Sequence, residues 1–209
     1  MKLAFDFGIT NTDIVSYKDG EMNFFTFPSE EISEEFIEKL LVHIKIKSSD
    51  VEVIAVTGGK SSDLKNVFRG IPIVKVNEIE AIGYGAKHLY SIHDSKYLAV
   101  SCGTGTACVA FINGEYSHMG GISVGGGTLQ GLSNLIIGKE NAEEINNLAL
   151  KGNKDNLDSL IGEVVNEIGT LYPEITASNF AKARYEDNFL EQDISSSLSN
   201  MVGEVIGTI

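Results

Sequence analysis

The sequence predicts an α/β fold built from a duplicated β-meander plus helices, and three observations support this prediction. Two segments, beginning near Lys2 and Lys96, each read as strand, turn, strand, turn, strand. The first turn of each segment carries glycine and threonine, at residues 8–10 and 103–106. Apolar residues at helical spacing follow each meander. We therefore expect two lobes, an N-terminal lobe at residues 1–92 and a C-terminal lobe at residues 93–209.

The first segment predicts two further strands and two helices after its meander. Ile32, Phe36, Leu40 and Ile44 recur at helical spacing and predict a helix over Glu30–Lys47. The dipeptide Asp19-Gly20 favours a hairpin turn. The remaining expected elements are the strands Lys2–Phe7, Thr12–Tyr17, Met22–Phe27, Val51–Thr57 and Ile71–Val76, and a helix over Glu78–Tyr90.

The second segment predicts strands over Lys96–Ser101, Ala107–Ile112 and Glu115–Met119, with Asn113-Gly114 as a hairpin turn. From Gly127 onward we expect mostly helix. A final helix carries an apolar stripe that includes Ile194, Leu198 and Val202 and is still running at Ile209. We expect this stripe to be uncovered, so that more chain or another subunit must pack on it.

Composition restricts the partners that this chain can have. The 209 residues are 43% hydrophobic and carry a formal net charge of −13, which argues against nucleic acid or an anionic membrane as partner. No run approaches the roughly 18 apolar residues of a membrane span, and no leader precedes the first strand. Cys102 and Cys108 form no CxxC and are expected to be small buried residues. We expect a cytoplasmic protein.

The glycine triplet Gly125–Gly127 leads directly into a predicted helix that starts with Thr128 and Leu129. Backbone amides at a helix N-terminus, together with the helix dipole, bind anions without a positively charged side chain. The chain has only two arginines, Arg69 and Arg184, so a phosphate site must use amides, hydroxyls, metal and a few lysines.

Other nucleotide and metal motifs are absent from the sequence. No GxxxxGK[ST] occurs, which excludes a P-loop, and no GxGxxG dinucleotide fingerprint occurs. His43, His88 and His93 lack metal-ligand spacing and are expected at the surface.

Several segments carry a resemblance to a known family. Two β-meanders with glycine-threonine turns are the plan of the actin, Hsp70 and sugar-kinase superfamily. More closely, VTGG (residues 56–59), NEIEAIGYGA (77–86), GTGT (103–106) and GGISVGGGTLQGL (120–132) resemble type II pantothenate kinases, as do NLALKGN (147–153) and TASNF (176–180). The resemblance implies a two-lobed actin-like, ribonuclease H-like ATPase fold. Nucleotide would bind between the lobes.

The resemblance also implies an activity and its partners. The activity is phosphorylation of the primary hydroxyl of pantothenate, the first step toward coenzyme A, and it depends on ATP and magnesium. The partner is a second copy of the chain, in a homodimer joined through the helices after Gly127. Members of the family continue beyond the position of Ile209 with a segment that covers adenosine. The second lobe is therefore expected to be incomplete at its C-terminus, and nucleotide affinity is expected to be lower.

The resemblance assigns phosphate contacts to three glycine-rich segments. Asp6 would hold the magnesium ion through water, and the alternative is a strand-end carboxylate that caps a turn. ATP and its phosphates would contact residues of both turns and of the helix start, and a plain hairpin turn is the alternative for the GTGT residues. The set is Asp6, Gly8, Thr10, Gly103, Thr104, Gly105, Thr106, Gly125, Gly126, Gly127, Thr128 and Leu129.

Glu78 matches the family's general base and lies at a predicted strand-to-helix junction. A carboxylate within hydrogen-bond reach can accept the proton of an attacking alcohol. The alternative is that Glu78, like Glu80, only complements the helix dipole. Substrate contacts are expected from Glu78, Thr104 and His118.

Three positions depart from the family pattern. Ile9 stands where relatives often have glycine and would narrow the first turn, and Asp13 stands where some have lysine. His118 replaces the arginine expected to contact pantothenate, and a histidine cannot bind a carboxylate bidentately. These departures leave two alternatives open, namely a kinase for another small alcohol and a catalytically weak nucleotide-binding regulatory protein.

Overall fold

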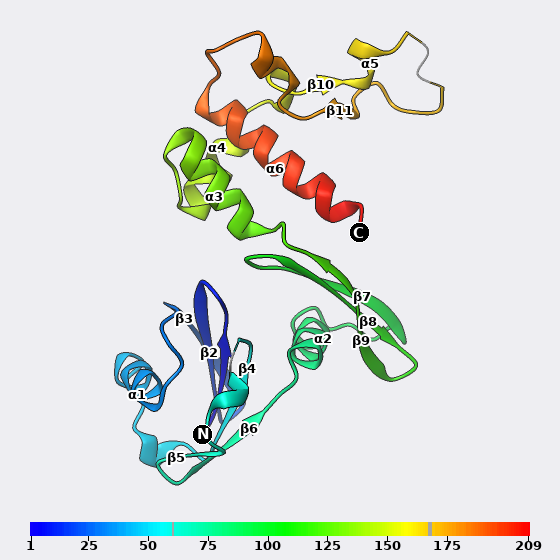
Figure 1. Ribbon diagram of the computed structural model, residues 1–209. Coiled ribbons are helices and arrows are strands. Elements are labelled where there is room, and N and C mark those ends of the chain that lie inside the picture. The colour runs from blue at the N-terminus through cyan, green and yellow to red at the C-terminus, as the bar shows by residue number, and fades with distance from the viewer. Residues whose placement is uncertain (60, 167–168) are drawn as a thin grey trace. The chain divides into compact units, whose positions relative to one another are not determined.

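The computed structural model describes residues 1–59, 61–166 and 169–209. The chain forms two compact units (Figure 1). The first contains residues 1–100 and 108–119, and the second contains residues 101–107 and 120–209. The predicted lobes at residues 1–92 and 93–209 remain a proposal.

A six-stranded sheet forms the first unit, with strand order β3-β2-β1-β4-β6-β5. Strand β1 pairs antiparallel with β2 and parallel with β4, and β2 pairs antiparallel with β3, so the first meander is confirmed. The short strand β5 was not predicted. The bounds are β1 Lys2–Phe7, β2 Asn11–Lys18, β3 Glu21–Pro28, β4 Val53–Thr57, β5 Val67–Phe68 and β6 Ile71–Lys75.

Alternation along β1 separates the core of this unit from its polar face. Leu3, Phe5 and Phe7 are buried, whereas Asp6 lies on the opposite face of the strand. The buried side of the sheet packs against helix α1, which covers Glu34–His43 and buries four apolar residues, Phe36, Ile37, Leu40 and Leu41. The amphipathic pattern therefore identifies the helix correctly.

Helix α1 is shorter than the predicted Glu30–Lys47. Ser33 begins it, because the Ser33 hydroxyl accepts a hydrogen bond from the Phe36 amide at 3.1 Å. Lys45 ends it by adopting a left-handed conformation with φ of 57°. The apolar residues outside these limits, Ile32, Ile44 and Ile46, still pack against the core, which explains why the periodicity extends further than the helix.

Helix α2, Glu78–Leu89, begins directly after β6. The Asn77 side chain accepts a hydrogen bond from the Ile79 amide at 2.9 Å, which fixes Glu78 as the first helical residue. The predicted start at Glu78 is confirmed.

A three-stranded sheet has the order β7-β8-β9, with bounds Lys96–Cys102, Thr106–Ile112 and Glu115–Ile122. Asn113 and Gly114 both have positive φ, as do Asp19 and Gly20 in the first meander, which is typical of two-residue hairpin turns. The duplicated strand pattern is thus confirmed in strand order and in turn geometry.

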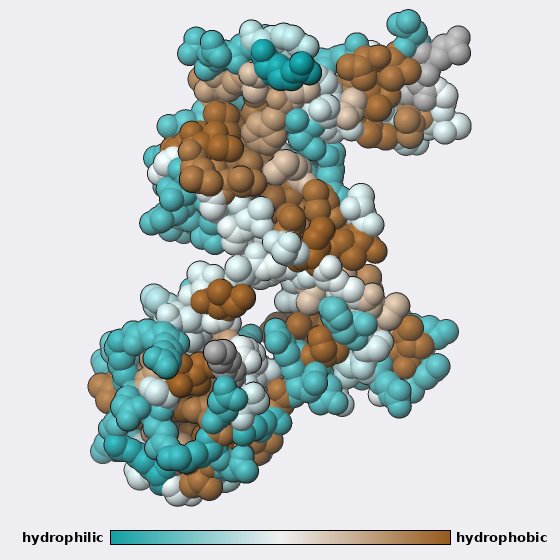
Figure 2. Space-filling view, in the orientation of Figure 1, coloured by the Kyte–Doolittle hydropathy of each residue, from teal (hydrophilic) through white to brown (hydrophobic). Residues whose placement is uncertain are grey.

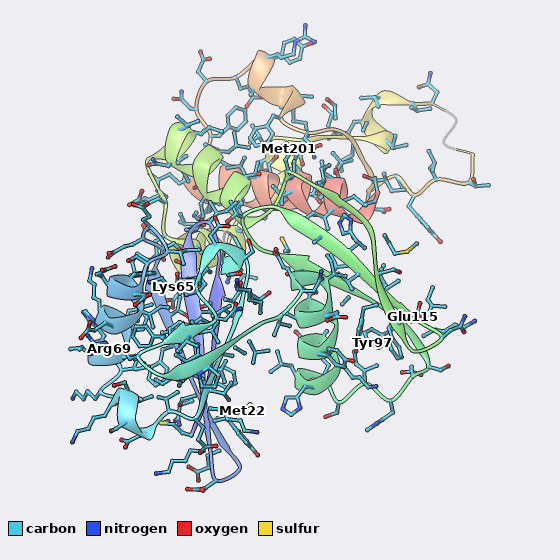
Figure 3. All side chains as sticks on the ribbon, turned by 60° about the horizontal axis from the view of Figure 1, so that its bottom comes forward. Met22, Lys65, Arg69, Tyr97, Glu115 and Met201 are labelled. Carbon is cyan, nitrogen blue, oxygen red and sulfur yellow. The ribbon has the colours of Figure 1, made fainter. Side chains whose placement is uncertain are left out.

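An aromatic seat formed by Tyr97 and Tyr116 holds helix α2 on this sheet. The Tyr97 hydroxyl donates to the Gly83 carbonyl at 3.0 Å and lies 2.8 Å from the Tyr116 hydroxyl. Figure 3 labels Tyr97 on the sheet beside α2. A Cβ atom on Gly83 would overlap the Tyr116 ring. Glycine at position 83 therefore allows the helix to rest directly on an aromatic surface.

The second unit contains helices α3 (Gly126–Ile137), α4 (Ala142–Ala149) and α6 (Glu191–Gly207). Leu198 and Val202 of the predicted apolar stripe are buried, and α6 packs against α3 and α4. The expectation of an uncovered stripe is therefore wrong at Leu198 and Val202, because neighbouring helices of the same unit cover them, and Ile194, Met201 and Val205 are half-buried. Ile209 remains 52% exposed.

Between α4 and α6 the expectation of helix is largely wrong. In its described residues, 150–166 and 169–190, this region has only short elements, which are β10 (Ser159–Leu160), α5 (Ile161–Val164), β11 (Thr176–Ser178) and single 3₁₀ turns at Lys154–Asn156 and Ala181–Arg184. Two buried carboxylates organise it. Asp158 accepts hydrogen bonds from the Phe180 amide and the Ser197 hydroxyl, and Asp193 accepts them from Asn153 and Asn156.

Two smaller expectations can be checked against the fold. Cys108 is buried as predicted, but Cys102 is exposed at the end of β7, so that half of the prediction is wrong. Among the helices in the described ranges, none has both the length and the apolar composition to cross a membrane.

Candidate functional site

The first glycine-threonine turn, residues 8–10, joins β1 to β2. A Cβ atom on Gly8 would lie 2.6 Å from the Asn11 carbonyl oxygen, so the turn requires glycine there. Ser29, just beyond β3, holds the turn from one side. Its hydroxyl donates to the Gly8 carbonyl at 2.6 Å, and its amide donates to the Thr10 carbonyl at 3.0 Å.

The two departures in this turn have separate structural outcomes. The Ile9 side chain is 84% exposed, so it does not fill the turn, and the expected narrowing is wrong. Asp13 lies opposite Asp6 in the β1–β2 register and accepts a hydrogen bond from the Thr26 hydroxyl at 2.6 Å. An acidic residue is therefore accommodated beside the turn.

Asp6 and Glu78 form an electrostatically coupled pair within the first unit. Loss of hydration raises the pKa of the Asp6 carboxyl, and the negative charges of Glu78 and then Asp13 raise this pKa further. Gly58, with φ of 75°, follows β4 and brings its backbone against the Asp6 carboxylate, where a Cβ atom would overlap it. The strand ends thus gather two carboxylates that the sequence separates by 72 positions.

Direct metal coordination by several side chains is not found here. Among the residues that the structure describes, no group of three or more His, Cys, Asp or Glu side chains could hold a metal ion. The expectation that Asp6 holds magnesium through water stays a prediction.

The second turn, residues 103–106, lies against the N-terminus of α3. The Gly126 amide donates to the Gly103 carbonyl at 2.7 Å, and the Gly127 amide donates to the Thr104 carbonyl at 3.2 Å. A Cβ atom on Gly125 would lie 2.7 Å from the Gly105 carbonyl oxygen. The glycine triplet is required because helix and turn meet backbone to backbone.

Hydroxyl groups at this junction also have partners within the protein. Thr106 is buried, and its hydroxyl donates to the Val124 carbonyl at 2.8 Å. The Thr128 hydroxyl donates to the Ser123 carbonyl and accepts from the Gly125 amide, both at 3.2 Å. Leu129 continues the helix by bonding the Gly125 carbonyl. These residues build the junction, and their contact with a nucleotide stays a prediction.

The predicted site residues fall into the two units as follows. Asp6, Gly8, Thr10, Glu78 and His118 belong to the first unit, where Glu78 and His118 are exposed. The second unit holds the residues 103–106 and 125–129.

Sequence reasoning missed Thr12 and Ser29. Thr12 is fully buried, and its hydroxyl lies 3.1 Å from that of Ser29. Hydroxyl residues at a strand start and a strand end form no recognisable motif, and only the pairing of β2 with β3 brings these two together.

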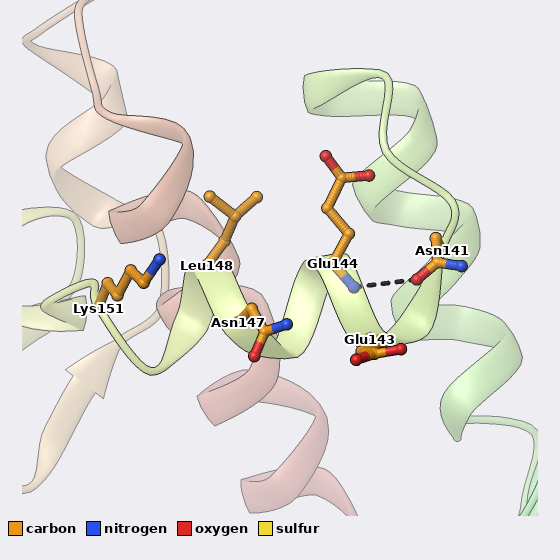
Figure 4. A pocket seen from close by; sticks show the side chains of 6 residues that line it. All are labelled: Asn141, Glu143, Glu144, Asn147, Leu148 and Lys151. Atoms are coloured by element: carbon orange, nitrogen blue, oxygen red, sulfur yellow. Dashed lines mark hydrogen bonds between the residues drawn. The ribbon is translucent and has the colours of Figure 1, made fainter.

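Two hollows lie at the surface of the described residues. One, of about 680 Å³, is bordered by Gly8, Ile9 and Ser29 together with Glu30, Glu31 and Asp63. The other, of about 380 Å³, follows one side of α4 (Figure 4). None of the predicted site residues borders the second hollow, whereas the first adjoins the 8–10 turn.

Comparison with known proteins identifies relatives along the whole chain. Residues 93–209 match the protein family described as Fumble. A type II pantothenate kinase of Bacillus cereus is 34% identical over 170 residues, which cover 77% of this chain and 60% of that protein. The type II pantothenate kinase of Staphylococcus saprophyticus is 31% identical over 216 residues, covering 100% of this chain and 78% of that protein. The chain thus spans about three fifths of the length of its Bacillus relatives.

A solved structure shows that the fold prediction is right. The activator of the 2-hydroxyisocaproyl-CoA dehydratase from Clostridium difficile, with bound ADPNP, superposes with a TM-score of 0.68 at 15% identity. The superposition covers 99% of this chain and 74% of that chain. The α/β fold of actin-like ATPases is therefore confirmed. The two sequence matches and the Fumble match agree with this fold, and they show that the chain belongs to the type II pantothenate kinase family.

Proposed function

We propose that this chain is, or forms the greater part of, an ATP-dependent kinase that phosphorylates the primary hydroxyl of pantothenate. This reaction is the first step toward coenzyme A. The relatives named type II pantothenate kinase support the proposal. Glu78 would be the general base and Asp6 the residue that faces the metal.

The similarity over most of the chain to relatives named type II pantothenate kinase is the observation that carries this proposal. Asp6 lies near the end of β1 and Glu78 begins α2, and loss of hydration, followed by the charge of Glu78, raises the pKa of Asp6. A kinase needs one carboxylate near the metal and a second that can accept the proton of the attacking alcohol. Glu78 is exposed and so can contact a substrate.

Magnesium fits the residues that are present. The negative charges around Asp6 disfavour its ionised form, and a nearby cation would relieve that cost. Asp6 would hold the ion through water. When bound, magnesium neutralises phosphate charge that develops during transfer.

ATP phosphates would be held by the two turns and by the start of α3. Gly8 and Thr10 belong to one turn, and residues 103–106 belong to the other. Residues 125–129, from Gly125 to Leu129, would support the second turn. The ADPNP bound by the fold relative supports a nucleotide for this fold. With such donors preorganised, little rearrangement is needed as charge develops.

His118 favours one second candidate, a kinase for a different small alcohol. It is exposed on β9 and would contact the substrate together with Glu78 and Thr104. A single histidine can donate or accept one hydrogen bond toward a hydroxyl, but it lacks the two-pronged grip of arginine on a carboxylate.

We further propose a cytoplasmic homodimer that uses the helices after Gly127. Leu135 is 83% exposed and Ile136 is 50% exposed on α3. Figure 2 shows that apolar residues gather on the unit that contains α3 and α6. Apolar helical surface of this kind is typical of subunit interfaces.

Release of ADP from magnesium-ATP tests the function, with pantothenate, pantetheine and simple sugars as separate acceptors. Turnover on pantothenate is expected, and Glu78→Gln should lower kcat by about 10²–10⁴-fold, the range for loss of a general base. Glu80→Gln is the matched control, because Glu80 is also exposed in the first turn of α2 and complements the same dipole.

Three outcomes separate the candidates. Turnover confined to another alcohol would replace pantothenate as substrate. Nucleotide binding without turnover on any acceptor, also in a chain extended past Ile209, would support a regulatory protein. Equal losses in the Glu78→Gln and Glu80→Gln variants would remove Glu78 as the base.

A further inference from the structure

A chain of hydroxyl groups ends on the carbonyl of Gly8. The Ser29 hydroxyl is 2.6 Å from the Gly8 carbonyl oxygen and 3.1 Å from the Thr12 hydroxyl. A carbonyl oxygen can only accept, so the single proton of Ser29 is used on Gly8. Thr12 must then donate to Ser29. The direction of the chain is therefore Thr12 to Ser29 to Gly8.

This series of hydrogen bonds fixes the orientation of the peptide group between Gly8 and Ile9. No cis peptide bonds occur in the described chain, and in a trans peptide the carbonyl and the following amide point in opposite directions. With the Gly8 carbonyl turned toward Ser29, the Ile9 amide points away from Ser29. The Ser29 amide holds the Thr10 carbonyl at 3.0 Å, so both ends of the turn are fixed.

The same series of hydrogen bonds polarises the peptide group between Gly8 and Ile9. A carbonyl that accepts a short hydrogen bond makes the amide of its own peptide group a stronger donor, and hydrogen bonds in series strengthen one another. Thr12 is fully buried, so water does not compete for its hydroxyl. The Ile9 side chain is exposed to solvent, so the group of Ile9 that can donate a hydrogen bond at the turn is its backbone amide.

We propose that Thr12 and Ser29 are positioning residues for the terminal phosphates of the nucleotide, because they orient and polarise the Ile9 amide as a phosphate donor. The proposal rests on the kinase function proposed above and adds two residues to it. It also accounts for isoleucine at position 9, since a backbone amide serves regardless of the side chain.

The second turn has a related arrangement within its own unit. The carbonyls of Gly103 and Thr104 are taken by the amides of Gly126 and Gly127. The amides that follow these carbonyls, on Thr104 and Gly105, are thereby turned the opposite way. In both turns, backbone carbonyls thus accept hydrogen bonds from groups outside the turn. The donor is a hydroxyl in the first turn and a helix N-terminus in the second.

Titration calorimetry of the full chain with magnesium-ADP, and with AMP for comparison, tests the proposal. Ser29→Ala is expected to weaken ADP binding about tenfold, the order expected for one hydrogen bond to a charged group, with AMP affinity unchanged. The KM for ATP should rise by a similar factor. Thr12→Val, which removes only the first hydroxyl, is expected to cause a smaller loss.

Two variants of similar size complete the design. Ser29→Thr keeps the hydroxyl and is expected to restore ADP affinity. Ser33→Ala removes the N-cap of α1 and lowers stability without touching the turn, so ADP affinity should remain that of the wild type. Thermal unfolding of each variant shows that the folded protein is compared.

The outcomes separate this proposal from the proposed function. If the wild type binds ADP and Ser29→Ala binds it equally well, the positioning role is overturned and the kinase function stands. The same holds if Ser33→Ala loses as much ADP affinity as Ser29→Ala. A wild-type chain that binds neither ADP nor ATP overturns both. Failure of Ser29→Thr to restore affinity overturns the role of the hydroxyl.

Discussion

Asp6 lies in an electrostatic environment that disfavours its ionised form. The folded protein holds the Asp6 proton more tightly than the unfolded chain does, because hydration is lost and because Glu78 and Asp13 are nearby. The free energy of unfolding therefore falls as pH rises from the ordinary range of aspartate through the raised pKa of Asp6. A cation bound near Asp6 would offset this loss.

Asp6→Asn is accordingly expected to raise the unfolding midpoint at neutral pH when a chelator is present. The gain should shrink as pH falls below the ordinary aspartate range, because Asp6 is then neutral in both folded and unfolded wild type. Urea unfolding at a series of pH values measures this difference. A gain that grows toward acid pH would contradict the assignment.

At single residues the sequence was a partial guide. Local pattern predicted that Asp6 lies near a strand end and that Glu78 begins a helix, and both positions are confirmed. Their roles were implied by the family resemblance and stay predictions. The effect of Ile9 could not be predicted, since side-chain direction in a turn depends on the backbone that Ser29 holds. Ser29 lies 21 positions from Gly8, and no local pattern connects them.

At the level of elements, the junction between the 103–106 turn and α3 packs closely at three consecutive glycines. Gly125, Gly126 and Gly127 all bring backbone against backbone, and each would carry a Cβ into a carbonyl oxygen of the turn. The turn-to-helix pattern could be predicted from the glycine triplet. The use of two helix amides within the protein could not, because it depends on tertiary contact.

Gly125→Ala should destabilise this junction by about 1–3 kcal/mol, the usual cost of overpacking, and weaken nucleotide binding. Gly131→Ala in the same helix is the control, because nothing lies within 4 Å of a Cβ there. That change is expected to stabilise by roughly 0.5–1 kcal/mol through helix propensity. Denaturant unfolding of both variants checks the pair, and similar effects in the two would count against the packing argument.

The region between α4 and α6 shows where pattern reading failed. Apolar residues there are spaced irregularly and turn formers such as Gly152 and Pro173 interrupt them. Its order comes from Asp158 and Asp193, which accept hydrogen bonds from amides and side chains up to 42 positions away. Buried carboxylates look like surface residues in a sequence, so this architecture has no local signal.

Considered as a whole, the molecule is an acidic protein for which an anionic ligand is proposed. Its net charge of −13 repels nucleotide at long range, so binding depends on short-range groups such as backbone amides, hydroxyls, a metal ion and a few lysines. The α/β class, the two meanders and the family could be predicted, because strand alternation, hairpin turns and glycine runs are local signals.

Added salt is expected to speed the association of magnesium-ATP with this chain. Salt screens the repulsion, with a Debye length of about 10 Å at 0.1 M, so a severalfold increase is expected between about 0.02 M and about 0.2 M. Stopped-flow mixing measures the rate, and uncharged adenosine serves as the control that should show no salt effect. Slower association at higher salt would show that a local positive potential outweighs the net charge.

The aromatic seat of α2 gives this chain a built-in optical signal. The protein contains no tryptophan, so its near-ultraviolet circular dichroism arises mainly from tyrosine and phenylalanine rings in fixed surroundings. Tyr97 and Tyr116, hydrogen-bonded to each other and to the helix that begins with Glu78, are rings of this kind. Their spectrum therefore follows the attachment of that helix without any label.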